Sequence, residues 1–183
     1  MNPARLFYRT RQFWLTLRPA SHLDYSLAAA FLTPRQMELF QRMQLSDQAH
    51  SLKVLQRILE KGSVPRDLCV AALLHDVGKI RLPLSPWERS LVVLLREVCD
   101  RCIQQWGKLS GEELATVPRW RRPFLLAENH PKWGAELAAA ADASPLAVAL
   151  IRRHQEKLSE KPGRNDTPED TFLRLLQAVD DSS

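Results

Sequence analysis

Apolar side chains recur every three to four residues along most of the chain, which is the spacing of one face of an α-helix. In the run SDQAHSLKVLQRILEKG, Val54 and Ile58 continue a stripe that begins at His50. No stretch of useful length alternates between apolar and polar residues as a half-buried β-strand does. The pattern therefore predicts an all-α fold, with helices near residues 4–17, 22–31, 34–43, 47–61, 66–76, 86–107, 130–141, 145–156 and 168–180.

Four of the predicted helices begin with a serine or threonine followed directly by proline. The hydroxyl can accept from backbone amides of the first turn, and proline fits the first helical position because its missing N–H would have no partner there. These starts are Thr33-Pro34, Ser85-Pro86, Ser144-Pro145 and Thr167-Pro168. Ser46 or Asp47 is predicted to cap the helix that stops at Gly62. Between the helices, prolines and glycines predict an irregular stretch over 108–128, with room for one short helix, and a polar loop over 157–168.

The composition is that of a globular protein. The chain has 183 residues, of which 45% are hydrophobic and 26% charged, and a chain of this size needs no disulfide to fold. Its three cysteines are an odd number, which argues against a disulfide framework and for a reducing compartment. Cys99 and Cys102 are expected to be small core residues of a helix. No signal peptide and no apolar run of about 18 residues is visible, so we expect a cytoplasmic protein without a transmembrane segment.

The net charge of +5 suits acidic partners such as nucleotides, nucleic acid or an anionic membrane surface, and a solvated basic surface without a partner is the alternative. The basic residues form loose clusters at 5–18 and 119–122, and neither is dense enough for a nucleic-acid stripe. Residues 5–17 mix arginines with apolar and aromatic side chains. We expect this segment to pack on the domain or on a second subunit of a homo-oligomer, with a membrane-surface helix as the alternative.

Histidines and aspartates replace apolar residues at the ends of several inward-facing stripes. His75 and Asp76 end the apolar helix in AALLHDVGK, His154 follows Leu150 and Ile151, and Asp180 follows Leu173 and Leu176 at helical spacing. A lone histidine on an apolar face is usually a core residue, but a buried carboxylate is costly without a cation or several hydrogen bonds. Several such groups in one core satisfy each other best around a divalent metal. Imidazole and carboxylate ligands suit several metals, so they do not show which metal would bind.

The order and context of these residues resemble the HD-domain superfamily of metal-dependent phosphohydrolases, whose pattern is H…HD…D on a helical core. His50, then His75-Asp76, then Asp180 match in order, ALLHDVGK is close to the characteristic LLHDIGK stretch, and the resemblance covers about residues 45–181. It implies an N-terminal helical extension over 1–44 and an HD-type domain over 45–183. It also implies that these four residues hold a first divalent metal.

Two further segments resemble HD-domain proteins with extra ligands, including the HD-GYP branch. NHPKWGAELAAA contains His130, and IRRHQEK contains His154. The resemblance then implies a second metal, with Asp76 bridging and with His130 and His154 as ligands. The chain departs from that branch because Gln155 replaces the second histidine of its HHE segment and the Gly-Tyr-Pro element is absent. Cyclic di-GMP is therefore not indicated as the substrate.

The resemblance implies hydrolysis of a phosphoester or phosphoanhydride bond in a small, nucleotide-like substrate by a metal-activated water. Asp76 would orient that water, and Lys79, one turn later, would neutralise phosphate charge. Arg153, beside His154, is a further predicted substrate contact. Iron, manganese, zinc, nickel, cobalt and magnesium are not distinguished by these ligands. The alternatives are a non-catalytic regulatory HD module that binds metal or nucleotide, and an HD-type nuclease.

Overall fold

The computed structural model describes residues 23–85, 88, 105–108, 114–158 and 167–182. These residues form helices and turns without a strand, so the predicted all-α class is confirmed. The chain divides into two compact units, one of residues 1–22 and 82–129 and one of residues 23–81 and 130–183. The predicted helix over 4–17 and most of the one over 86–107, with Cys99 and Cys102, lie outside the described residues.

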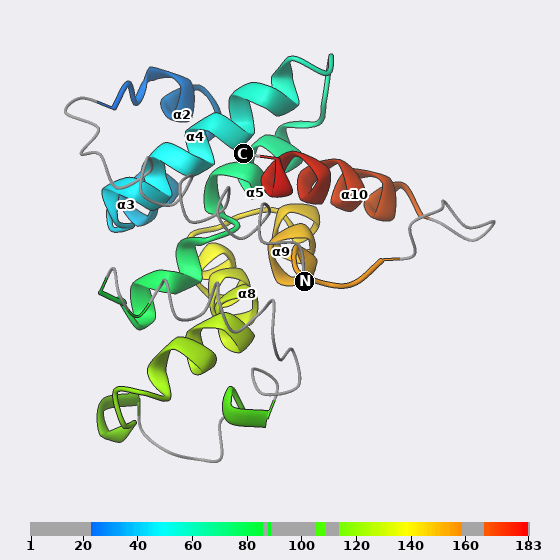
Figure 1. Cartoon of the computed structure of the whole chain (residues 1–183). Helices are drawn as coiled ribbons and strands as arrows, with labels where there is room; N and C mark the ends of the chain where they lie inside the picture. Colours follow the sequence, from blue (N-terminus) through cyan, green and yellow to red (C-terminus); the bar gives the residue numbers. More distant parts are fainter. Residues whose placement is uncertain (1–22, 86–87, 89–104, 109–113, 159–166, 183) are drawn as a thin grey trace. The chain divides into compact units, whose positions relative to one another are not determined.

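The second unit holds most of the described helices (Figure 1). Helix α8 passes into it from the first unit, and the 3-10 helix η2 lies in the first unit. The elements are α2 (Ser26–Phe31), α3 (Pro34–Gln41), α4 (Leu45–Leu59), α5 (Arg66–Leu74), the 3-10 helix η1 (Val77–Arg81), η2 (Leu114–Thr116), α8 (Arg122–Ala140), α9 (Pro145–Arg153) and α10 (Pro168–Asp181).

Helix α5 forms the centre of the second unit. Every residue from Leu68 to Leu74 is buried, as expected for a helix that is apolar all round. It contacts α2, α4, α9 and α10, and α10 also packs on α4 and α9 (Figure 1). The C-terminal end of α5 therefore lies among helices that come from distant parts of the sequence.

Three of the four predicted serine and threonine caps are confirmed, at Thr33, Ser144 and Thr167. Thr33 and Thr167 form reciprocal capping boxes with Gln36 and Asp170, and the Ser144 hydroxyl accepts from the Ala147 amide. The prediction for α4 was wrong, because this helix begins at Leu45 and its N-cap, Gln44, makes no side-chain cap. The Asp47 carboxylate instead lies 4.0 Å from the ammonium group of Lys79, which lies on η1.

Helix α8 is longer than predicted. Sequence patterns predict irregular chain over 108–128 and a helix from 130, but α8 begins at Arg122. The added turns bury Pro123 and the run Phe124–Ala127 in the first unit. This burial outweighs the prolines and glycines that predict irregular chain there. Pro131 therefore lies inside the helix, where it removes one backbone donor.

Helices α2 and α3 belong to the same compact unit as α4 and α5. The Tyr25 hydroxyl donates to the Gln48 side chain at 2.8 Å, and Arg66 donates to the Phe31 carbonyl at 2.7 Å. The boundary between an extension over 1–44 and a domain over 45–183 stays a prediction. In the part of the chain that the structure describes, no helix is both long enough and apolar enough to cross a bilayer.

Candidate metal centre

The end of α5 places His75 and Asp76 in the interior. His75 is the C-cap of α5, and its side chain is 1% exposed. Its Nδ1 donates to the Ala72 carbonyl at 2.9 Å, which leaves Nε2 as the nitrogen that can bind a cation once it is deprotonated. This Nε2 is buried and has no hydrogen-bond partner among the described residues. Such an orphaned buried nitrogen is unusual in a folded protein and is a candidate ligand.

Helix α9 ends in the same way as α5. His154 is its C-cap, and the His154 Nδ1 donates to the Ile151 carbonyl at 2.7 Å. Its imidazole is buried, and its ring centroid lies 5.3 Å from that of His75. In both helices, a backbone carbonyl of the last turn accepts from Nδ1 and so orients the Nε2 of the histidine toward the interior.

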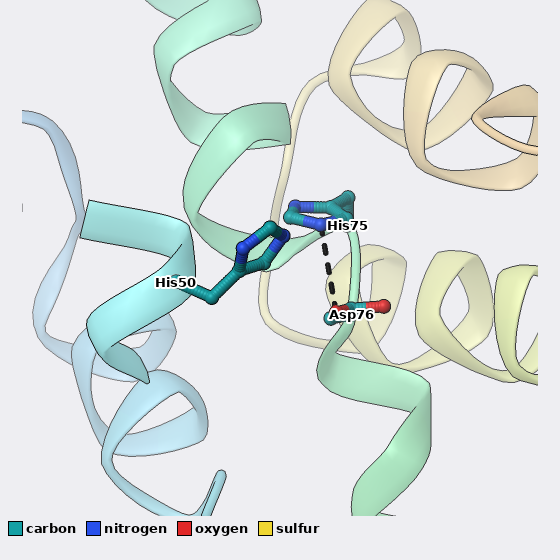
Figure 2. Close-up of side chains that lie close together, drawn as sticks. All are labelled: His50, His75 and Asp76. Atoms are coloured by element: carbon teal, nitrogen blue, oxygen red, sulfur yellow. Dashed lines mark ion pairs between the residues drawn. The ribbon is translucent and has the colours of Figure 1, made fainter. Parts of the chain in front are cut away.

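A first group of ligand atoms forms where α4, α5 and α10 meet. The His50 Nε2 lies 2.7 Å from the Asp180 Oδ1, and the same oxygen lies 3.5 Å from the His75 Nε2. The His75 Nε2 is also 3.5 Å from the Asp76 Oδ2. Figure 2 shows His50, His75 and Asp76 pointing toward one another. His50 and Asp180 are about a quarter exposed, at 26% and 27%, so this group is open to solvent on one side.

A second group forms on the other side of Asp76. The His130 Nε2 lies 3.5 Å from the Asp76 Oδ1 and 3.2 Å from the His154 Nε2. Asp76 therefore directs one carboxylate oxygen to each group. The structure thus brings together all six predicted ligands, namely His50, His75, Asp76, His130, His154 and Asp180.

Two glycines let α8 approach closely enough to deliver His130. A Cβ atom at Gly78 would lie 2.0 Å from the His130 carbonyl oxygen and 2.6 Å from the Gly134 nitrogen. A Cβ at Gly134 would lie 3.2 Å from both the Gly78 nitrogen and the Ile151 side chain. The backbones of η1 and α8 can lie this close only because both residues lack a side chain.

The charges in the centre support one another. Burial disfavours a charged His75, but the carboxylates of Asp76 and Asp180 outweigh it and raise the pKa of His75 to about 9. Burial raises the pKa of Asp76, but Lys79 and His75 outweigh it, so this pKa is well below its ordinary value. Burial and the neighbouring His130 lower the pKa of His154 to about 3. Near neutral pH the Asp76 carboxylate is ionised and the His154 imidazole is neutral, which are the forms that bind metal.

These residues fit divalent cations. Two ligands that each lie about 2.1 Å from one cation lie roughly 3–3.4 Å apart. The separations of 3.5 Å from His75 to Asp76 and of 3.2 Å from His130 to His154 are close to this range. The donor set combines imidazole nitrogens with carboxylate oxygens, which suits iron, manganese, zinc and related ions without selecting one.

Comparison with known families agrees with this geometry. The sequence model of the HD domain matches residues 48–181. The chain belongs to the HD-domain family. Members of this family are generally metal-dependent hydrolases. Searches of curated proteins and of solved structures found no match to the chain.

In this HD domain, Lys79 lies beside the Asp76 carboxylate. Its ammonium donates to the Asp76 Oδ2 and lies 4.0 Å from the Asp47 Oδ1. Asp47 is buried, and sequence reasoning missed it as part of the site. Its place one turn before His50, on the inward face of α4, is the signal that could have found it.

Arg153 lies at the end of α9 but is held by carboxylates of this HD domain. Its guanidinium donates to Glu156, Glu169 and Asp170, and these contacts raise its pKa. Arg153 thereby ties the end of α9 to the first turn of α10. Its contact with substrate stays a prediction.

Proposed function

We propose that this HD domain is a phosphohydrolase that holds two divalent cations and cleaves a phosphoester or phosphoanhydride bond of a small, nucleotide-like substrate. The observation that carries the proposal is the Asp76 carboxylate, whose two oxygens lie 3.5 Å from His75 on one side and 3.5 Å from His130 on the other. A carboxylate shared in this way is a natural bridge between neighbouring cations.

Each side chain has a distinct role in this proposal. His50, His75, Asp76 and Asp180 hold one cation, and Asp76, His130 and His154 hold the other. When bound, such cations activate a water for attack and neutralise charge on the phosphoryl group. Asp76 orients the attacking water. The open side of the first group, at His50 and Asp180, supports entry of substrate there.

Lys79 supplies the positive charge for the phosphate. Its ammonium is 29% exposed and held between Asp76 and Asp47, so it is fixed beside the proposed reacting group and still open to solvent. An ammonium in this position can neutralise charge that develops on a phosphoryl oxygen. The net charge of +5 also favours an anionic substrate.

The first experiment measures metal content and phosphoester hydrolysis on the same samples. The purified chain, loaded anaerobically with Fe²⁺ or Mn²⁺, is expected to hold two metal equivalents and to hydrolyse generic phosphomonoesters, phosphodiesters or nucleotides. Asp76→Ala should lose hydrolysis and metal, because it removes the shared ligand. His130→Ala should lose about one equivalent. The matched control is His22→Ala, which removes the histidine outside the predicted set and should keep both.

Two results would contradict the proposal in different ways. A wild-type chain without metal and without hydrolysis under these conditions refutes the enzyme and the metal centre together. A chain that holds its metal but turns over none of the phosphoesters is a binding module that has kept the centre, and the hydrolase proposal is then wrong.

A further inference from the structure

The side chain of Gln155 converges on the second group of ligand atoms. Gln155 directly follows His154, and its amide nitrogen lies 3.2 Å from the His130 Nε2. The same Nε2 lies 3.2 Å from the His154 Nε2 and 3.5 Å from the Asp76 Oδ1. Three predicted ligands and one carboxamide thus meet at a single point.

The backbone on both sides of Gln155 is held by α10. The Gln177 amide donates to the His154 carbonyl at 3.0 Å and to the Glu156 carbonyl at 2.8 Å. Arg153 adds its ion pairs to Glu169 and Asp170. Although the Gln155 side chain is exposed, it therefore starts from a fixed backbone position within reach of the second group.

A carboxamide can serve this position in two ways. Its NH₂ group donates to the His130 Nε2 when that nitrogen keeps its lone pair. A cation that takes the lone pair displaces this hydrogen bond. A half turn about the last side-chain bond then presents the carboxamide oxygen in place of the nitrogen, and amide oxygens are established ligands of divalent cations.

We infer that Gln155 is a ligand of the second cation and contributes a neutral oxygen beside Asp76, His130 and His154. The inference rests on the proposed two-cation centre. It also makes the two positions unequal. The first position has the carboxylates of Asp76 and Asp180, whereas the second has only the shared Asp76 carboxylate and a neutral amide. The second cation therefore binds more weakly and enters after the first.

Metal titration tests this inference without any assay of catalysis. Metal-free wild-type protein is titrated with Mn²⁺ by calorimetry, and electron paramagnetic resonance reports when two Mn²⁺ ions become neighbours. We expect two binding steps. Gln155→Ala should weaken the second step about tenfold and leave the first within about twofold, because loss of one supporting group commonly costs 10–100-fold in metal affinity. Gln155→Glu should tighten the second step about tenfold, because it replaces a neutral oxygen with an anionic one.

The matched control is Gln56→Ala, which removes an exposed glutamine from α4 and should change neither step. A second step that stays within twofold of wild type in Gln155→Ala overturns the inference and leaves the two-cation function standing. If Gln155→Ala fails to fold, Gln155→Glu decides, and an unchanged second step in that variant also overturns the inference. A wild-type chain that takes up a single Mn²⁺ overturns both the inference and the two-cation centre.

Discussion

Gly78→Ala tests whether the contact between η1 and α8 sets the position of His130. The added methyl would lie 2.0 Å from the His130 carbonyl oxygen, whereas a carbon and an oxygen in ordinary contact are about 3.3 Å apart. The atoms that the methyl would meet belong to the backbone of α8, and these cannot move aside as the end of a flexible side chain can. The helix must shift by roughly 1 Å, because the difference of these distances has to be made up.

Two consequences of this shift can be estimated. Forcing extra atoms into a packed interior costs about 1–3 kcal/mol of unfolding free energy. Ligand distances at a metal are held to about ±0.2 Å, so a helix displaced by much more no longer presents His130 correctly. None of His50, His75, Asp76 and Asp180 lies on α8. We therefore expect Gly78→Ala to keep the first metal equivalent and lose the second.

Urea unfolding and elemental analysis measure the two effects on one preparation. The control is Gly62→Ala, because Gly62 has φ +126° and no atom within 4 Å of an added Cβ. That variant should lose stability through its backbone alone and keep both metals. Gly134→Ala, with contacts of 3.2 Å, should fall between the two. A Gly78→Ala protein with two metal equivalents and an unfolding free energy within about 0.5 kcal/mol of wild type would refute the reasoning.

Three further outcomes are expected. Lys79→Met should keep both metals but lower kcat/KM for phosphoesters about 100-fold, and an unchanged rate would remove Lys79 from the mechanism. Asp47→Asn should lower kcat/KM about tenfold with metal content unchanged, because it loosens Lys79 rather than removing its charge; metal loss would show another role. Mn²⁺ affinity should rise with pH from 6 to 9, by up to about tenfold per unit, because a His75 pKa of about 9 means that the cation must displace a proton below that pH. Calorimetry in buffers of different ionisation enthalpy counts this proton, and an affinity independent of pH would contradict it.

Much of the fold was predictable because its signals are local. A hydroxyl at Thr33 or Thr167 reaches an amide only three residues away, so the sequence suffices to place these helix starts. The start of α8 was not predictable in this way. From the local sequence, Pro131 is expected at the first position of a helix, but it lies inside α8. The helix extends toward Arg122 because Phe124–Ala127 are buried by packing within the first unit, which local sequence does not encode.

For the site, too, residues on local patterns were predictable and contacts between distant residues were not. Helical spacing and the family resemblance were enough to gather His50, His75 and Asp180, since each ends or lies on an apolar stripe. The contacts of Gln155 with His130 and of Gln177 with the turn after α9 join residues more than 20 positions apart, and no periodicity encodes them. Arg153 was predicted from its neighbour alone, and its partners Glu169 and Asp170 lie beyond the polar loop.

The centre is also built from three helix ends of the same polarity. His75 and His154 are the C-caps of α5 and α9, and Asp180 is the penultimate residue of α10. The aligned peptide dipoles of each helix place about half a negative charge at its C-terminus. Together with Asp76 and Asp180 they create a field that attracts cations and repels a phosphate group. For the proposed two-cation hydrolase, this field predicts an order of binding in which the cations load before an anionic substrate.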